Sequence, residues 1–294
     1  MSLALAFLHD GSTRGEARGD LVIPWWSFGK TLIAATALRL CEQGRLGLDR
    51  PVEGMTLRQL LRHESGLADY GAVQAYHLAV AQGETAWSRH EMLSRVGPER
   101  RLFPPGEGWA YSNIGYLRVR ELIEQAYGDD LGAAAGDLVL RPLGVVGARL
   151  AIGPEDLTDV QMGSAQGYDP GWVYHGLFVG PLRDAAALLD GLFGPGSPLS
   201  TGSRTAMLAH RPLPQHSRPP WAMAGYGLGC MTPQMAQGWQ AAGHTGGGPG
   251  SHIAVYRRLE GPASTAAVFA FATDQHSVEA AVVRLLTDGS LDSP

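Results

Sequence analysis

The segment from Ser27 to Gln43 constrains the fold of this 294-residue chain most, because it has a helical pattern that is apolar on nearly every side. The residues that make it so are Leu32, Ile33, Ala34, Ala35, Ala37, Leu38, Leu40 and Cys41. A helix of this kind is stable only when other elements surround it. Ser27 is a plausible cap at its start, and Gly44 is a plausible stop. We therefore expect the chain to fold around this helix.

Candidate strands lie at both ends of the chain. After about residue 222, short runs rich in β-branched and aromatic residues alternate with glycine, at Tyr226–Met231, Ile253–Arg257 and Thr265–Phe271, and a helix follows near Val278–Leu286. Strands that are neighbours in sequence favour antiparallel pairing over βαβ units. We expect the N-terminal runs, Leu3–Leu8 and Thr13–Arg18, to join the same sheet.

The middle of the chain reads as helical. Capping boxes at Thr56–Gln59 and Ser88–Glu91 predict short helices, Ile114–Ala126 is a further helix that ends at Gly128, and Pro181 opens another. The predicted fold class is α+β, an antiparallel β-sheet flanked by helices with an inserted, mainly helical region. We expect residues 1–54 and 175–294 to form a discontinuous sheet domain and residues 55–174 a helical domain, with a site in the cleft between them.

Composition argues against several classes of partner. The formal charge is −5, which disfavours nucleic acid or an anionic membrane surface as a partner. No run approaches the ~18 apolar residues of a membrane span, and Leu3–Leu8 has no basic lead-in, so we expect a cytoplasmic protein. The presence of only two cysteines argues against a disulfide scaffold, and the lack of a His-Glu-x-x-His pattern argues against a metal site. We expect no cofactor.

The first segment with candidate chemistry is Ser27-Phe28-Gly29-Lys30, which holds the only lysine among 23 basic residues. Positions i and i+3 of a helix share a face, so the hydroxyl and the amine can meet. A buried amine loses its charge more easily than arginine does, and it can then help to take a serine proton. Taken alone, the tetrapeptide favours the simpler interpretation of a helix cap and a surface lysine.

Two further segments are weaker when taken singly. Tyr111-Ser112-Asn113 opens a helix, and cationic neighbours would lower the pKa of the phenol and make it a usable base. Asn113 offers both a donor and an acceptor for a carbonyl or amide. The run from His244 to Gly250 has the glycines that let a strand pass beside a ligand, although a glycine-rich hairpin has the same composition.

Together, Ser-x-x-Lys, Tyr-x-Asn and His-Thr-Gly resemble the triple signature of the serine β-lactamase-like and penicillin-binding superfamily. The chain is most similar to the branch related to class C β-lactamases, with D-Ala-D-Ala carboxypeptidases, D-aminopeptidases and esterases as relatives. Leu60–Leu67, Arg141–Gly144 and Tyr226–Gly229 match further landmarks, and the resemblance covers about residues 20–275.

The resemblance implies catalytic roles for three residues. Ser27 would be the acylated nucleophile, and Lys30 would hold and tune the proton network. Tyr111 would act as general base in acylation and help to activate water in deacylation.

The resemblance also implies substrate-binding roles. The backbone N–H groups of Ser27 and Gly247 would form an oxyanion hole, and Asn113 would orient the substrate carbonyl. His244 would supply positive character and a donor beside Tyr111, and its neighbour Thr245 belongs to the same substrate-binding strand. Class C β-lactamases usually carry lysine at the position of His244, which disfavours strong β-lactamase activity.

The predicted function is therefore a serine hydrolase that acts through an acyl-enzyme on a small ester or amide substrate. A D-Ala-D-Ala-type peptidase or β-lactamase is the alternative, and a catalytically silent binding protein on the same fold is the second. An α/β-hydrolase is disfavoured because no serine has glycine two residues before it. The expected partner is a small-molecule acyl substrate, and the sequence leaves the oligomeric state open.

His63 is expected to be structural. Candidate pocket walls are Trp25, Trp26, Tyr70, Trp172, Tyr174 and His175.

Overall fold

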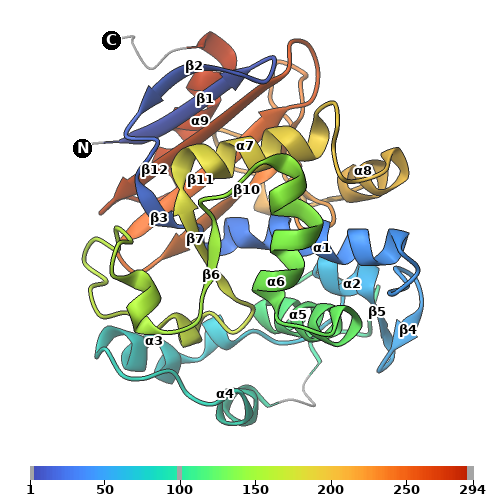
Figure 1. Cartoon of the computed structure of the whole chain (residues 1–294). Coiled ribbons are helices and arrows are strands. Elements are labelled where there is room, and N and C mark those ends of the chain that lie inside the picture. Colours follow the sequence, from blue (N-terminus) through green and yellow to red (C-terminus); the bar gives the residue numbers. More distant parts are fainter. Residues whose placement is uncertain (1–2, 98–100, 290–294) are drawn as a thin grey trace.

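The computed structural model describes residues 3–97 and 101–289, and it contains a five-stranded antiparallel sheet (Figure 1). The strands are ordered β10-β11-β12-β1-β2. Their bounds are Ala4–His9 (β1), Ser12–Ala17 (β2), Ala241–Gly248 (β10), Ser251–Arg258 (β11) and Ser264–Phe271 (β12). Strand β1 pairs with β12, with Ala4 opposite Phe269 and His9 opposite Ser264. The predicted union of N-terminal and C-terminal strands in one sheet is confirmed.

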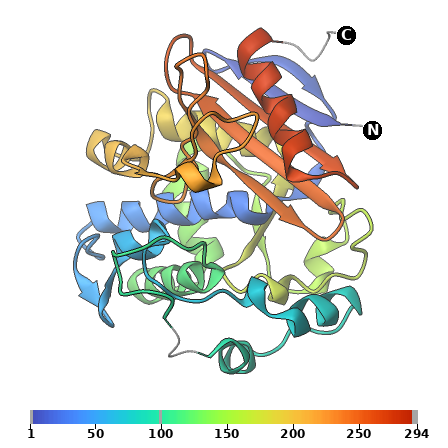
Figure 2. The same cartoon turned by 180° about the vertical axis from the view of Figure 1, so that it is seen from behind.

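Helices cover both faces of this sheet. Helix α9 (Gln275–Asp288) packs on one face against β11 and β12, as the view from behind shows (Figure 2). Helix α7 (Leu182–Phe193) packs on the other face against β1 and β12. The side of α7 that the sequence predicts to be apolar is buried, at Leu182, Ala185, Leu188, Leu189 and Leu192. The predicted α+β class is confirmed by this arrangement.

The apolar helix of the sequence is α1 (Gly29–Glu42), and it lies between the sheet region and the helical region (Figure 1). Every residue from Gly29 to Leu38 is buried. The prediction that Ser27 caps this helix is wrong. Ser27 belongs to a 3₁₀ turn, η1 (Trp26–Phe28), that runs directly into α1, and Phe28 occupies the cap position. Because η1 continues the helical path, the serine hydroxyl is free to make other contacts.

The helical region is built from α2 (Leu57–Leu61), α3 (Gln74–Ala81), α4 (Arg89–Val96), α5 (Asn113–Tyr127) and α6 (Leu131–Ala135). The Thr56–Gln59 capping box at α2 has both of its hydrogen bonds, and the Ser88 side chain caps α4 by accepting from the Glu91 N–H. Helix α5 packs against α1 and brings the 111–113 segment to it. The sequence therefore predicts these helix starts correctly.

Smaller elements complete the chain. A three-stranded sheet contains β3 (Val22–Pro24), β7 (Leu177–Pro181) and β6 (Arg149–Ala151), in that order. The other short strands and the remaining α-helix are β4 (Pro51–Val52), β5 (Met55–Thr56), β8 (Arg211–Pro212), β9 (Gly225–Tyr226) and α8 (Thr201–Leu208). The 3₁₀ turns are η2 (Tyr70–Ala72), η4 (Arg141–Leu143), η5 (Pro154–Leu157), η6 (Pro170–Trp172) and η7 (Pro214–His216), and η3 (Gly136–Leu140) is a π-helical turn.

The strand predicted over Tyr226–Met231 is wrong. Within this range Tyr226 belongs to β9, which pairs with β8, and Met231 makes an isolated bridge with Gly243 of β10, whereas residues 227–230 form no strand. Gly229 has φ +71°, in the left-handed region, so the chain turns there. A Cβ atom at Gly229 would lie 2.3 Å from the Cβ of Ala34, and the Gly229 carbonyl accepts a hydrogen bond from Thr31 at 2.8 Å. This turn packs directly on α1.

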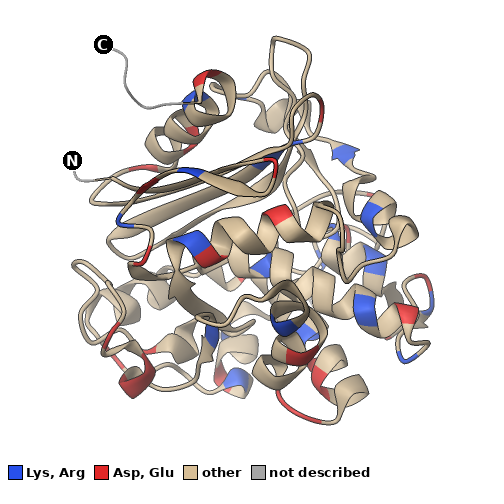
Figure 3. Cartoon of the chain, turned by 45° about the horizontal axis from the view of Figure 1, so that its top comes forward, with Lys and Arg blue, Asp and Glu red and all other residues tan. Residues whose placement is uncertain are grey.

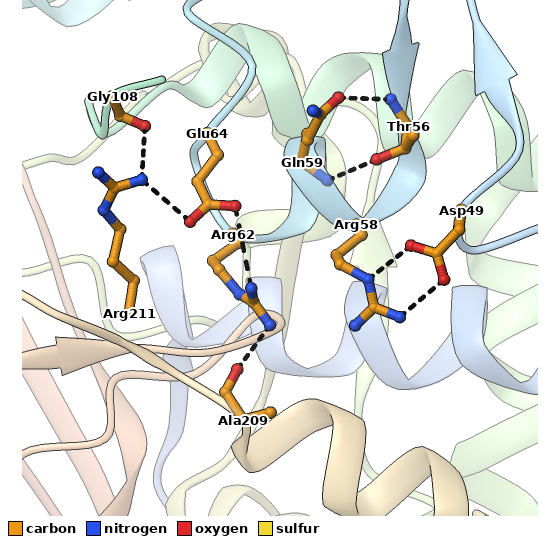
Figure 4. A network of polar contacts seen from close by, with 9 residues as sticks. All are labelled: Asp49, Thr56, Arg58, Gln59, Arg62, Glu64, Gly108, Ala209 and Arg211. Carbon is orange, nitrogen blue, oxygen red and sulfur yellow. Dashed lines mark hydrogen bonds and ion pairs between the residues drawn. The ribbon is translucent and has the colours of Figure 1, made fainter. Parts of the chain in front are cut away.

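A polar network joins the segment after α2 to the segment around β8 (Figure 4). Glu64 lies 3.3 Å from Arg211 and 3.9 Å from Arg62. Arg62 donates to the Ala209 carbonyl at 2.7 Å, and Arg211 donates to the Gly108 carbonyl at 3.2 Å. The network therefore ties the helical region to the C-terminal part of the chain beside His63.

Charges of both signs are interspersed along the ribbon in the view of Figure 3. Across the described ranges, no helix combines the length and apolar character that crossing a membrane requires. Within the same residues, no three His, Cys, Asp or Glu side chains are grouped so that they could hold a metal ion.

Candidate active site

Ser27 is presented by a backbone that is unusual on its N-terminal side. Trp26 has φ +42°, a conformation that costs a residue with a Cβ about 1–3 kcal/mol. The Trp26 ring is held in place, because its Nε1 donates to Ser251 at 3.0 Å and it packs edge-on against Tyr168. The Phe28 N–H bonds the Trp25 carbonyl at 2.9 Å. The nucleophile candidate is thus fixed by contacts from several parts of the chain.

The Ser27 hydroxyl contacts the two residues that the sequence pairs with it. Its Oγ lies 2.9 Å from the Tyr111 hydroxyl and 3.2 Å from Lys30 Nζ. Lys30 Nζ also donates to Asn113 Oδ1 at 2.7 Å and lies 3.0 Å from His175 Nε2. The structure therefore brings together Ser27, Lys30, Tyr111 and Asn113, which are 86 positions apart in sequence at most.

Lys30 is fully buried, and burial makes its ammonium group easier to deprotonate. Burial lowers the pKa of Lys30 from 10.5 to about 7, although the negative charge of Asp69 acts in the opposite direction. Near neutral pH the amine is therefore present in both protonation states. As an ammonium group it finds three acceptors, on Ser27, Asn113 and His175.

Asp69 orients the amide of Asn113, and sequence reasoning missed it. Its Oδ1 accepts the Asn113 backbone N–H at 2.9 Å, and its Oδ2 accepts from Nδ2 at 3.2 Å. This fixes the amide with its oxygen toward Lys30. Asp69 is a single acidic residue in an irregular loop, and no spacing pattern in the sequence marks it.

The electrostatic prediction for Tyr111 is wrong. Lys30 Nζ lies 5.0 Å from the centre of its ring, yet burial raises the pKa of Tyr111 well above 10, and the hydrogen bond with Ser27 opposes this only in part. The resting residue is therefore a neutral phenol. In this form the hydroxyl donates to Ser27 Oγ.

His63 packs against Tyr111 and bonds to the backbone of the residue that follows it. It is fully buried, its ring lies 4.3 Å from the Tyr111 ring, and its Nδ1 accepts the Ser112 N–H at 3.1 Å. Burial lowers the pKa of His63 well below 6.5, so it is neutral. This geometry agrees with the structural interpretation of His63.

The prediction that His244 supplies positive character is also wrong. His244 is fully buried, and burial lowers its pKa to about 3, with Lys30 acting in the same direction. Its Nε2 lies 2.9 Å from the Tyr226 hydroxyl and its Nδ1 lies 2.7 Å from the Thr245 carbonyl. Both ring nitrogens are thus engaged with the protein, and the neutral imidazole holds β10 and Tyr226 beside Tyr111.

Strand β10 runs beside Ser27 through its glycines. A Cβ atom at Gly246 would lie 2.7 Å from the Ser27 amide nitrogen, and one at Gly247 would lie 2.6 Å from the His252 ring. Thr245 and Gly247 line the same cavity as Ser27. The two amides of the predicted oxyanion hole therefore belong to segments that pack against each other.

These residues open on a cavity of about 970 Å³. Of the six aromatic and histidine residues expected in its wall, Trp26, Tyr70 and His175 line it. Trp25, Trp172 and Tyr174 do not: Trp25 is fully buried and donates to the Gly180 carbonyl, and Tyr174 lines a smaller, separate cavity. The aromatic walls that the sequence missed include Trp109, Tyr168, Trp221, Tyr226 and Tyr256.

Several known proteins are similar to parts of this sequence. The chain is 36% identical over 116 residues to penicillin-binding protein 4* of Bacillus subtilis, a match that covers 35% of this chain and 24% of that protein. It is 32% identical over 160 residues to esterase EstB of Burkholderia gladioli, covering 47% and 41%. A D-aminopeptidase of Cereibacter sphaeroides is 29% identical over 141 residues, covering 46% and 27%. The matched part of the chain thus spans less than half the length of each of these relatives.

Solved structures share the fold over nearly the whole chain. A D-stereospecific amidohydrolase from Streptomyces sp. superposes with a TM-score of 0.79 at 23% identity, covering 98% of this chain and 94% of that one. A D-amino acid amidase from Ochrobactrum anthropi SV3 gives a TM-score of 0.80 at 22% identity, covering 97% and 95%. The sequence profile of the family described as Beta-lactamase matches residues 2–288. The chain belongs to the beta-lactamase family, within the class C-like group of serine hydrolases that includes penicillin-binding proteins, esterases and D-aminopeptidases.

Proposed function

We propose that the protein is a serine hydrolase that cleaves a small ester or amide through an acyl-enzyme on Ser27. The observation that carries this proposal is the contact of Ser27 Oγ with both Lys30 Nζ and the Tyr111 hydroxyl. An amine with a pKa of about 7 is matched to proton transfer near neutral pH. The names of relatives, an esterase, D-aminopeptidases and a D-amino acid amidase, support an ester or amide as the substrate class.

In acylation, the neutral amine of Lys30 accepts the Ser27 proton as Oγ bonds to the substrate carbonyl carbon. The charge that develops on the carbonyl oxygen is stabilised by the backbone N–H groups of Ser27 and Gly247. The carbon–oxygen or carbon–nitrogen bond then breaks, and the proton reaches the leaving group through the Tyr111 hydroxyl. This division of roles gives the base function to Lys30, because Tyr111 is a neutral phenol at rest.

In deacylation, a water molecule attacks the acyl carbon and loses its proton to the same pair. Oγ of Ser27 then leaves with a proton, so the enzyme returns to its starting state. Asn113, held by Asp69, orients the acyl group.

The test is labelling with a fluorophosphonate and with a fluorescent penicillin, followed by mass spectrometry of the adduct. We expect fluorophosphonate labelling at Ser27, none in Ser27→Ala, and turnover of p-nitrophenyl acetate that is lost in the same variant. Folded protein that neither probe labels would refute the proposal in favour of a silent binding protein. Slow release of bound penicillin would favour the peptidase alternative.

A further inference from the structure

The cavity contains a buried acidic side chain that the proposed chemistry does not use. Glu279, in the second turn of α9, is 3% exposed and lines the same cavity as Ser27. Its Oε1 accepts hydrogen bonds from Thr245 Oγ1 at 2.6 Å and from Gln275 Nε2 at 2.8 Å. Among residues 3–97 and 101–289 no cationic side chain pairs with it, in contrast to Asp190, which pairs with Arg257.

Both hydrogen bonds to the Glu279 carboxyl group come from neutral donors and reach the same oxygen, Oε1. A buried carboxylate that lacks a cation is costly unless another positive group completes it. Arg218 is the other formally charged side chain of the cavity wall, and it is exposed to solvent. The acidic side chain of this wall is thus buried, whereas the basic one faces solvent.

Aromatic side chains of the same cavity are linked to the Glu279 carboxyl group through Thr245. The Tyr256 hydroxyl lies 2.9 Å from Thr245 Oγ1, the same atom that donates to Glu279. The Trp221 ring lies 4.9 Å from the Tyr256 ring, and both rings line the cavity. Aromatic faces beside a carboxylate attract organic cations through electrostatic and cation–π interactions. We call the set Thr245, Tyr256, Trp221 and Glu279 the Glu279 corner.

We propose that the Glu279 corner is a specificity subsite that binds an ammonium group of the substrate. This inference rests on the proposed hydrolase function, and it narrows the substrate class to cationic esters or amides. The same carboxylate repels a substrate carboxylate, so penicillins and peptides with a free C-terminal carboxylate are poor substrates. The corner adjoins the strand that carries Gly247, which places the ammonium group within the same cavity as the reacting carbonyl.

The test uses two pairs of probes that differ only in charge. Alaninamide, as either enantiomer, is paired with isobutyramide and carries its ammonium group on the acyl side. Acetylcholine is paired with 3,3-dimethylbutyl acetate and carries its charge on the alcohol side. Turnover is measured with wild type, Glu279→Gln and Asp288→Asn, and binding is measured by calorimetry in Ser27→Ala with and without Glu279→Gln. Asp288 is an exposed residue of the same helix, so its substitution controls for net charge.

We expect wild type to prefer the cationic member of at least one pair, and Glu279→Gln to lower its kcat/KM about tenfold, which corresponds to one well-made charged contact. The neutral member should change less than about twofold by the same reckoning, and Asp288→Asn should behave as wild type. Calorimetry should show the same loss of preference in Ser27→Ala/Glu279→Gln.

Equal losses for the cationic and neutral members would assign Glu279 a structural role and overturn the subsite. So would the absence of any cationic preference in wild-type turnover and in Ser27→Ala binding. Failure to hydrolyse the neutral 3,3-dimethylbutyl acetate, with cationic binding intact, would instead count against the hydrolase proposal alone.

Discussion

At the scale of single residues, Lys30 is the group whose chemistry depends most on its surroundings. Its pKa of about 7 follows from burial, and the neutral amine is the form that accepts a proton. The rate of hydrolysis should therefore rise with pH through about 7 and level off above it. The measurement is the pH profile of kcat/KM for p-nitrophenyl acetate.

Lys30→Arg tests the same residue, because a guanidinium stays protonated in proteins. We expect a folded variant that loses about 10²–10⁴-fold in kcat/KM, the usual contribution of a general base. Circular dichroism checks the fold, and Lys30→Met provides an uncharged variant in case the larger head group is not accommodated. Rates near wild type for Lys30→Arg would contradict the role of the amine.

The sequence predicts site residues best where their spacing along the chain shows that their side chains can meet. Ser27 and Lys30 share a helical face, and Tyr111 and Asn113 flank a helix start, so four contacting groups could be predicted. Asp69 could not, because its contact with Asn113 depends on the path of a loop. The sequence predicts the charge states of Tyr111 and His244 in the wrong direction, because burial is the largest influence on both pKa values and no local pattern reports how deep a side chain lies.

At the scale of elements, the approach of β10 to η1 depends on Gly246. Alanine there would place a Cβ atom 2.7 Å from the Ser27 amide nitrogen, against backbone rather than a flexible side chain. We expect Gly246→Ala to fold with about 1–3 kcal/mol less stability and to lose most fluorophosphonate labelling at Ser27.

Gly15→Ala is the matched control, because a Cβ atom at Gly15, in the strand β2, meets nothing within 4 Å. It should label at the wild-type rate. If Gly246→Ala also labels at that rate, the close contact of the two segments does not set the reactivity of the serine.

The network of Figure 4 offers a second comparison of elements. Glu64→Gln weakens a largely buried junction between Arg62 and Arg211, whereas Asp49→Asn weakens an ion pair with Arg58 whose acidic side chain is 67% exposed. We expect about 1–3 kcal/mol of destabilisation for the first and under about 1 kcal/mol for the second, measured by urea unfolding. If both substitutions lower the free energy of unfolding by the same amount, burial of the Glu64 junction does not strengthen its ion pairs.

The sequence predicts helices and strands best where the hydrophobic pattern extends over many residues. The buried α1, the apolar side of α7 and the two long strands β11 and β12 follow from periodicity. The turn at Gly227–Gly229 reads as a strand in the sequence, because its aromatic and aliphatic neighbours resemble strand residues and no local pattern shows that Gly229 has a left-handed backbone.

At the scale of the whole molecule, the single lysine becomes a reporter of folding. Lys30 is fully buried, and the amino terminus supplies the only other primary amine of the chain. In native protein, an N-hydroxysuccinimide ester should modify the amino terminus and leave Lys30 unmodified. Lys30 should react in step with global unfolding across a urea series, as followed by peptide mass spectrometry. Rapid modification of Lys30 in native protein would show an opening that this structure does not contain.

The pairing of β1 with β12 has a consequence for the order in which the protein is made. Ala4 must wait for Phe269, so strands β1 and β12 cannot pair until the ribosome has passed residue 269. The glycine strand that approaches Ser27 also emerges more than two hundred residues after the serine. The nascent chain thus carries Ser27 through more than two hundred residues of synthesis without the strand that packs beside it, so the proposed hydrolase activity should arise only after β10 has been made.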